Sequence, residues 1–273
     1  MMQKPKVIVL RDKKPDLSEL LVTEEGQLSQ VRAAHLFNDT DALFRITLRT
    51  SFPEVGVVAI KKMLRKKRAR KAAYRLPTVA VTAKCDDVAA DAIRRMAVSG
   101  EWEKLGYARD MSRRSNLGRS KQILSLFARI TEEQLSQVLE RGNVDMVQKI
   151  AEIAPSTVSS KLLKLAADKG DWKTIGYVAR TVPVAGMEAI ELLGDAKRWR
   201  ELLPATDSEH KELANEAKRQ YLKATPEDVG NAKEWHIVET IWRYGNEETR
   251  PVAAKALEER GYGFRMKNND PTN

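Results

Sequence analysis

The chain has 273 residues, of which 42% are hydrophobic and 32% charged, and its formal net charge is +10. This composition is typical of a folded protein and excludes disordered and fibrous classes. The longest apolar runs span only a few residues, against the ~20 that cross a bilayer, so we expect no membrane-spanning segment.

The cysteine content and the N-terminus bear on location. Cys85 is the single cysteine, so the chain can form no internal disulfide and no cluster of thiolate metal ligands. The N-terminal apolar run at 7–10 is shorter than the roughly 7 to 15 residues of a signal peptide core. We therefore expect a cytoplasmic protein.

Residues 1–27 differ from the rest of the chain. The stretch "KVIVLRD" is rich in β-branched residues and indicates an extended or partly ordered N-terminal arm. A helical pattern begins with "QLSQVRAAHLF", and we expect one helical domain over 28–262. The tail 263–273 is polar and terminal, which predicts disorder.

Three segments share an apolar pattern that begins V-x-x-x-A. "VGVVAIKKM" at 55–63 matches "VAADAIRRM" at 88–96, with an offset of 33, and "VAAKALEER" at 252–260 repeats its opening. Pro53 and Pro251 precede two of these segments and suit the first turn of a helix. The pattern therefore predicts helices that recur along the chain.

Two further pairs of segments repeat. "SGEWEKLGYARD" at 99–110 matches "KGDWKTIGYVAR" at 169–180 with an offset of 70, and "GDAKRW" at 194–199 matches "GNAKEW" at 230–235 with an offset of 36. Because the larger offset is close to twice the smaller ones, we interpret all of them as one module of about 35 residues, which holds two helices and their turns.

The Gly-acid-Trp turn makes specific predictions about geometry. Gly170 suits the left-handed position after a helix, and Asp171 suits the N-cap of the next helix. Gly106 and Gly176 lie inside predicted helices, where glycine costs ~1 kcal/mol, so we expect a neighbouring helix to approach closely. Trp102 and Trp172 are then structural residues of the turn.

These features resemble the HEAT-repeat family, in which helix pairs with a V-x-x-x-A-[IL] core recur every thirty to forty residues. The resemblance covers 40–64, 86–97 and 247–260, whereas tetratricopeptide-like or mixed helical repeats remain open for 99–245. It implies an all-α protein, a right-handed α-solenoid of helical hairpins that binds partners along its surface.

The positive charge is concentrated in one part of the chain. Lys and Arg exceed Asp and Glu by 1 over 1–50 and by 12 over 51–130, while 131–273 carries an excess of three acidic residues. A solvated helix face normally mixes both signs. The predicted binding residues are Lys61, Lys62, Arg65, Lys66, Lys67, Arg68, Arg70, Lys71, Arg75, Arg94, Arg95, Arg113, Arg114 and Arg119.

Register within the repeat favours a common surface. Lys61 and Lys62 occupy the same repeat positions as Arg94 and Arg95, so stacked helices would bring the two pairs together. A concave basic surface of this kind suits the phosphates of nucleic acid. Tyr74 and Tyr107 could stack on bases or fill the core and its rim.

Other partners remain open. An acidic protein could bind the same cations, and the charge could also serve solubility alone or act as a nuclear address. A different scaffold surface would use Trp235 and Trp242, which otherwise fill the last core between repeats.

Catalytic signatures are absent from the sequence. His35, His210 and His236 lack metal-ligand spacing, and the phosphate-binding and nucleophile motifs do not occur. We therefore expect a non-enzymatic protein with no cofactor, no metal and no small-molecule substrate.

A minor alternative is similarity to HEAT-like alkylpurine DNA glycosylases, which use tryptophans and an acid in a basic groove. Trp102 with Asp110, or Trp172 with Asp171, could take these roles. The repeated positions of the tryptophans favour structure over catalysis.

Overall fold

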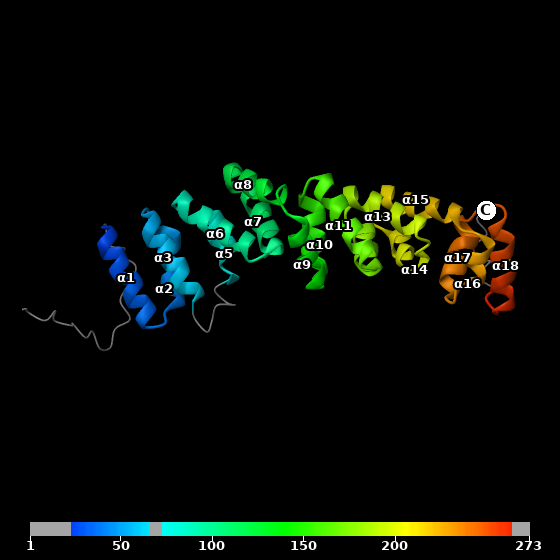
Figure 1. The fold of residues 1–273 in the computed structure, drawn as a ribbon, viewed down its shortest axis with the longest axis horizontal. Helices are drawn as coiled ribbons and strands as arrows, with labels where there is room; N and C mark the ends of the chain where they lie inside the picture. Colours follow the sequence, from blue (N-terminus) through cyan, green and yellow to red (C-terminus); the bar gives the residue numbers. More distant parts are fainter. Residues whose placement is uncertain (1–22, 66–72, 264–273) are drawn as a thin grey trace, which may run out of the picture. The chain divides into compact units, whose positions relative to one another are not determined.

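The computed structural model describes residues 23–65 and 73–263, and every regular element in those ranges is helical (Figure 1). None of the helices in these ranges is long and apolar enough to cross a membrane. The chain divides into two compact units. Unit 1 comprises residues up to 99 together with 107–119, and unit 2 comprises 100–106 and the residues from 120 onward. The all-α prediction is confirmed.

The helices of unit 1 are α1 (Glu24–Leu36), α2 (Thr40–Arg49), α3 (Pro53–Leu64), α5 (Leu76–Thr82) and α6 (Asp86–Val98). Two helices contribute residues to both units, α7 (Trp102–Ser115) and α8 (Leu117–Phe127). Unit 2 continues with α9 (Glu132–Glu140), α10 (Val144–Ile153), α11 (Ser156–Asp168), α12 (Trp172–Thr181), α13 (Pro183–Asp195), α14 (Trp199–Leu202), α15 (Lys211–Gln220), α16 (Pro226–Asn231), α17 (Trp235–Tyr244) and α18 (Thr249–Glu259), and two short 3-10 helices, η1 (Leu203–Asp207) and η2 (Tyr221–Lys223).

The first helix begins earlier than the sequence pattern predicts. Thr23 caps α1, because its hydroxyl accepts a hydrogen bond from the N–H of Gly26 (3.3 Å). Residues 24–27 are therefore helical rather than part of an extended arm. The predictions for 1–22 and for 264–273 lie outside the described residues.

Hydrogen bonds between hairpins show how α2 and α5 run in unit 1. At the helix starts, the Arg75 guanidinium pairs with the Asp41 carboxylate and donates to the carbonyl of Thr40 (3.3 Å). At the helix ends, the N–H of Lys84 donates to the carbonyl of Leu48 (2.9 Å). Because start meets start and end meets end, the two helices are parallel.

The helices α1, α3 and α6 share a direction as well. The Thr50 hydroxyl, just after α2, donates to the Gln27 side chain in the first turn of α1 (2.7 Å), so α1 begins beside the start of α3. Gly56 in the first turn of α3 faces Val88 in the first turn of α6, since a Cβ on Gly56 would lie 2.2 Å from Val88 Cγ2. These three helices begin at one edge of unit 1 and end at the opposite edge.

The core of unit 1 follows the apolar pattern of the repeat. Ala59, Ile60 and Met63 of α3 are buried, as are the equivalent Ala92, Ile93 and Met96 of α6. The equivalent sequence positions of the two segments therefore form equivalent parts of the core.

The helix pairs of unit 1 also recur at the predicted spacing. Helix α2 begins at Thr40 and α5 at Leu76, while α3 begins at Pro53 and α6 at Asp86. Both steps agree with the repeat length that the sequence predicts for this part of the chain.

Several turns of unit 2 share one local geometry. Gly142 and Gly170 follow α9 and α11 with φ values of +61° and +71°, and each is followed by a residue that caps the next helix. The Asp171 carboxylate accepts a hydrogen bond from the N–H of Thr174 (3.3 Å), which confirms the predicted N-cap. Lys197 has the same left-handed conformation, with φ +53°.

The repeat in unit 2 is shorter than predicted. The residues at the N-caps of α10, α12, α14 and α16 are Asn143, Asp171, Arg198 and Thr225, so their residue numbers increase by 28, 27 and 27. The predicted module length therefore does not apply here.

The offset of 70 between the two Gly-acid-Trp turns combines two unequal steps. The step from Glu101 to Asn143 contains the additional helix α9, whereas the step from Asn143 to Asp171 contains only the hairpin of α10 and α11. The offset is therefore not two copies of one module.

The match between "GDAKRW" and "GNAKEW" has a different structural meaning from the one predicted. Trp199 begins α14, which belongs to the series of helices that starts with α10, whereas Trp235 begins α17, which follows α16. The two segments share the chemistry of a helix start. They do not occupy equivalent places in the stack.

The two helical glycines mark close helix approaches, as predicted. A Cβ on Gly176 would lie 2.7 Å from the carbonyl oxygen of Glu201 in α14. A Cβ on Gly106 would lie 3.0 Å from side-chain atoms of Lys149 and Ile153 in α10. In unit 2, glycine therefore permits α12 to pack directly against the backbone of α14.

We predict that Gly170→Ala destabilises the protein by about 1 to 2 kcal/mol, which is the cost of a left-handed conformation for a residue with a Cβ. No atom lies within 4 Å of that Cβ position, so the cost is conformational and involves no clash. Chemical denaturation of both proteins measures the difference.

Gly230→Ala is the matched control, because Gly230 also has an open Cβ position but lies in α16 without a positive φ. It should be neutral or stabilise by up to about 1 kcal/mol. Equal losses for the two variants would contradict the left-handed assignment at Gly170.

Candidate functional site

Eight of the fourteen predicted binding residues have described side chains, and all eight lie in unit 1. Arg114 lies on α7, but its side chain is not described. Five of the residues lie outside the described part of the chain: Lys66, Lys67, Arg68, Arg70 and Lys71.

Arg119 has a structural role, which differs from the predicted one. Its side chain is buried, with the residue only 8% exposed, and the guanidinium donates to the carbonyls of Val81 (2.5 Å) and Ala83 (2.7 Å) at the end of α5. It also pairs with the Asp86 carboxylate (2.7 Å). Arg119 therefore stabilises the turn between α5 and α6 and cannot face a ligand.

Arg75 and Arg95 also have intramolecular partners. Arg75 pairs with Asp41, and its guanidinium lies 4.9 Å from the centre of the Phe44 ring. Arg95 Nε lies 2.5 Å from Asp91 Oδ2, and this carboxylate is buried. Each of these arginines has a carboxylate beside it, so each contributes little net charge to the surface.

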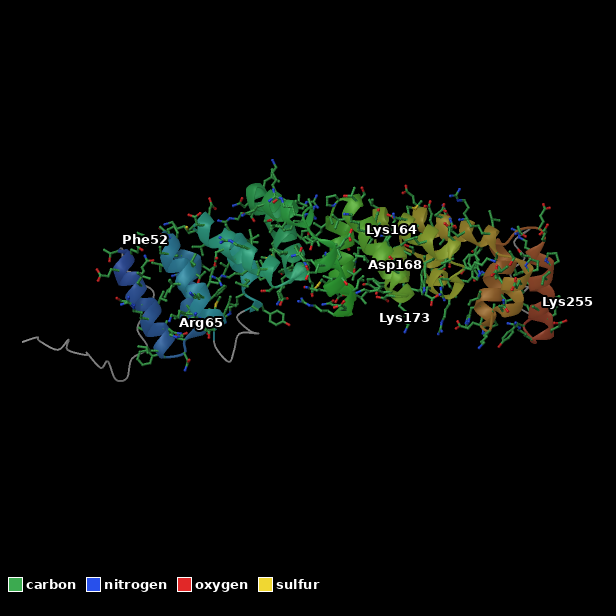
Figure 2. All side chains as sticks on the ribbon, viewed as in Figure 1. Phe52, Arg65, Lys164, Asp168, Lys173 and Lys255 are labelled. Carbon is green, nitrogen blue, oxygen red and sulfur yellow. The ribbon has the colours of Figure 1, made fainter. Side chains whose placement is uncertain are left out.

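The remaining five cations have no carboxylate within ion-pair distance among the described residues. Lys61, Arg65 and Arg94 are exposed, and Lys62 is half-buried in the last turn of α3. Arg65 follows α3 directly (Figure 2). Arg113 is exposed near the end of α7.

Four of these five cations lie along one edge of unit 1. Because α1, α3 and α6 end at the same edge, this edge carries Lys61, Lys62 and Arg65 at the end of α3 and Arg94 in the last turns of α6. We call this edge the basic edge, and it consists of the C-terminal turns of α1, α3 and α6 together with the first turns of α2 and α5. The register of Lys61 and Lys62 with Arg94 and Arg95 therefore has a structural counterpart.

The carboxylates of α2 at the basic edge are both engaged. Asp39 caps α2 and accepts a hydrogen bond from the N–H of Ala42 (2.9 Å). Asp41 pairs with Arg75. Neither lies within ion-pair distance of the lysines of α3, so neither compensates the positive charge of those lysines.

The cations of unit 2 are arranged differently, because many of them have carboxylate partners. Several of these pairs join neighbouring hairpins, such as Lys169 with Glu140 (3.1 Å) and Lys223 with Asp195 (2.6 Å). The hydrogen bond and charge of Lys169 lower the pKa of Glu140. In unit 2 these ion pairs stabilise the stack of helices, whereas Lys61, Arg65 and Arg94 at the basic edge face solvent.

Large apolar side chains are exposed at the basic edge. Leu36 is 78% exposed and Phe37 is 68% exposed at the end of α1, Tyr74 is 74% exposed just before α5, and Val98 is 82% exposed at the end of α6. Tyr107, on α7, is 59% exposed, so neither tyrosine fills the core, whereas a place at the rim of the core stays a prediction.

Sequence reasoning missed Leu36, Phe37 and Val98. Their place in the sequence could have indicated exposure, since all three follow the last buried residue of the preceding helix turn, Ala34 in α1 and Met96 in α6.

The tryptophans at the Gly-acid-Trp turns pack against the protein. Trp102 is 2% exposed and meets the Phe127 ring edge-on at 5.5 Å. Trp172 is half-buried beneath the Arg198 guanidinium, which lies 4.8 Å from the ring. These contacts favour the structural interpretation over a role in a catalytic groove.

The acids proposed beside those tryptophans also have partners. Asp171 caps α12, and Asp110 pairs with Arg109 (3.1 Å). Across residues 23–65 and 73–263, no cluster of three or more His, Cys, Asp or Glu side chains could hold a metal ion.

Trp235 and Trp242 are both half-buried on α17. Trp235 stacks on Tyr262, with ring centres 5.0 Å apart. This contact ties the start of α17 to the residues after α18, so Trp235 belongs partly to the packing at this end of unit 2.

Comparisons with known proteins give no relatives. The sequence matches no protein-family model, and searches of curated proteins and of solved structures find no match.

We predict that Arg119→Met destabilises the protein by about 2 to 4 kcal/mol, because two buried carbonyls at the end of α5 would lose their donor. Arg119→Lys should fall between wild type and Arg119→Met, since one ammonium cannot reach all the acceptors of a guanidinium. Thermal and urea unfolding measure the losses.

Arg113→Met is the control, because Arg113 is exposed and has no carboxylate partner in the described chain. It should leave stability within about 0.5 kcal/mol of wild type. A stable Arg119→Met protein would contradict the structural role of Arg119.

We also predict that Trp102→Ala costs about 3 to 5 kcal/mol of stability, as expected for a large buried aromatic side chain. Trp172→Ala should cost less, because part of the Trp172 ring is already in contact with solvent. Denaturant titration of the two variants checks the order, and a larger loss for Trp172→Ala would overturn it.

Proposed function

We propose that unit 1 binds nucleic acid through the basic edge, by contact with phosphates and without reading sequence. One observation carries the proposal. Lys61, Lys62, Arg65 and Arg94 lie at adjacent helix ends and have no carboxylate partner among the described residues, although cations elsewhere in the chain are often paired.

The physical argument rests on exposure and charge. Phosphates supply most of the binding energy in sequence-independent recognition, and Lys and Arg side chains neutralise them. Packed helices typically lie about 8 to 10 Å apart. This spacing brings the cations of α3 and α6 within reach of one strand of nucleic acid. The alternative of surface charge for solubility alone does not account for the placement of four such cations at one edge of unit 1.

A structural reason for the same cations must be weighed. Lys61 and Lys62 occupy the last turn of α3, where a positive charge interacts favourably with the helix dipole by about 0.3 to 1 kcal/mol. Arg65 is the C-cap residue of α3 and shares this effect. Arg94 lies before the last turn of α6, where the dipole effect is small, so phosphate binding explains more of the cluster.

The second candidate is an acidic protein partner. It is supported by Leu36 and Val98, which could bury against a protein surface beside the cations. We further propose a non-enzymatic, HEAT-like solenoid arrangement for the helical hairpins. The glycosylase alternative has less support, because its tryptophans and acids already have structural contacts.

The proposal predicts salt-dependent binding of mixed-sequence DNA or RNA, with a slope of ~0.7 to 0.9 per neutralised phosphate in a plot of log affinity against log salt. Replacing Lys61, Lys62, Arg65 and Arg94 by Gln should weaken binding at low salt and reduce this slope by up to about 3. Fluorescence anisotropy with labelled oligonucleotides measures both quantities.

The matched control replaces Lys164, Lys173, Lys211 and Lys233 of unit 2 by Gln. These four lysines are exposed and have no described carboxylate partner, and two of them are labelled in Figure 2. The control should retain the wild-type slope, and circular dichroism verifies folding of both variants. Wild-type protein without salt-sensitive binding, or equal losses for the two sets, would refute the proposal.

A further inference from the structure

Aromatic rings accompany the cations at the basic edge. Phe37 lies in the turn between α1 and α2, and Tyr74 lies just before α5. The two rings are among the most exposed large apolar side chains of the described chain. Burial of exposed aromatic surface is a major source of binding energy, so rings left in solvent beside a charged surface indicate a contact site.

Hydrogen bonds bring the two rings to neighbouring turns. Arg75, adjacent to Tyr74, pairs with Asp41 and donates to the carbonyl of Thr40, three residues after Phe37. Arg75 also stacks over Phe44 in α2. The turn that carries Phe37 is therefore held beside the residue that follows Tyr74.

The cations complete this arrangement. Lys61, Lys62 and Arg65 end α3, and α3 lies between α1 and α6 at the basic edge. The positive charge can follow a phosphate backbone, and the rings can stack on bases. This combination is the one that sequence-tolerant single-strand binding uses.

We infer that the basic edge binds single-stranded nucleic acid in preference to a duplex, with Phe37 and Tyr74 as stacking platforms for unpaired bases. This inference rests on the proposed function and adds the class of nucleic acid to it. A duplex keeps its base faces stacked on one another, so it offers only phosphates to this edge. A single strand offers phosphates and base faces together.

The test uses the full chain and labelled mixed-sequence probes of about 16 nucleotides, as a single strand and as a duplex. Three double variants are compared. Phe37→Leu with Tyr74→Leu removes the rings but keeps apolar side chains, and Phe37→Tyr with Tyr74→Phe keeps both rings. Tyr107→Leu with Tyr177→Leu removes two other partly exposed rings, one on α7 and one on α12.

The wild type should bind the single strand more tightly than the duplex. The double leucine variant at Phe37 and Tyr74 should lose about 5-fold or more in single-strand affinity per ring, with duplex affinity unchanged. The variant that keeps both rings should bind like wild type. The variant at Tyr107 and Tyr177 should also bind like wild type, because neither of those rings lies at the basic edge.

Several results would overturn the inference. One is a wild type that binds strand and duplex with equal affinity. Another is a Phe37 and Tyr74 leucine variant that keeps full single-strand affinity. A third is a Tyr107 and Tyr177 variant that loses as much single-strand affinity as the Phe37 and Tyr74 leucine variant. Vesicles of phosphatidylserine and phosphatidylcholine provide a further arm. Binding to vesicles tighter than to the strand, and retained when leucine replaces the rings, would assign the edge to a lipid surface instead.

The outcome also separates this inference from the proposed function. Salt-sensitive binding to strand and duplex alike would leave phosphate binding intact and refute only the stacking. Absence of salt-sensitive binding to either probe would refute both.

Discussion

Tight chain reversal between antiparallel helices is the constraint on which the packing depends. At several turns, one residue with a positive φ ends a helix, and the next residue caps the following helix. Asn38 precedes Asp39, Gly142 precedes Asn143, and Gly170 precedes Asp171. Because each reversal uses so few residues, the apolar faces of the two helices meet directly. The buried stripes of both units follow from this geometry.

Local chemistry made these turns predictable from sequence, whereas spacing did not. Gly170, Asp171 and the close approach at Gly176 all follow from what glycine and a short acid do at a helix boundary. The repeat length failed in unit 2 because similar turns mark similar local structure and do not count the helices between them. The additional helix α9 made the distance between the two Gly-acid-Trp turns resemble two equal modules.

The charged residues show the same division between local and distant information. Lysines and arginines in a basic stretch look equivalent in sequence, and the exposed ones at the end of α3 could be anticipated from the buried stripe beside them. The role of Arg119 could not be anticipated, because its acceptors lie 33 to 38 residues earlier in the chain. Only the fold distinguishes an arginine that serves carbonyl groups from one that faces solvent.

The turn at Lys197 differs from those at Gly142 and Gly170, because a residue with a Cβ adopts the left-handed conformation there. Its ammonium lies 3.2 Å from the Asp228 carboxylate in α16. Burial would raise the pKa of Asp228, but hydrogen bonds from Thr225 and Lys197 outweigh this and lower it.

The conformational strain at Lys197 is thus offset by a contact with the next hairpin. If α16 opens, that compensation is lost, so the turn and α16 should exchange their amide hydrogens as one cooperative segment, unlike the glycine turns.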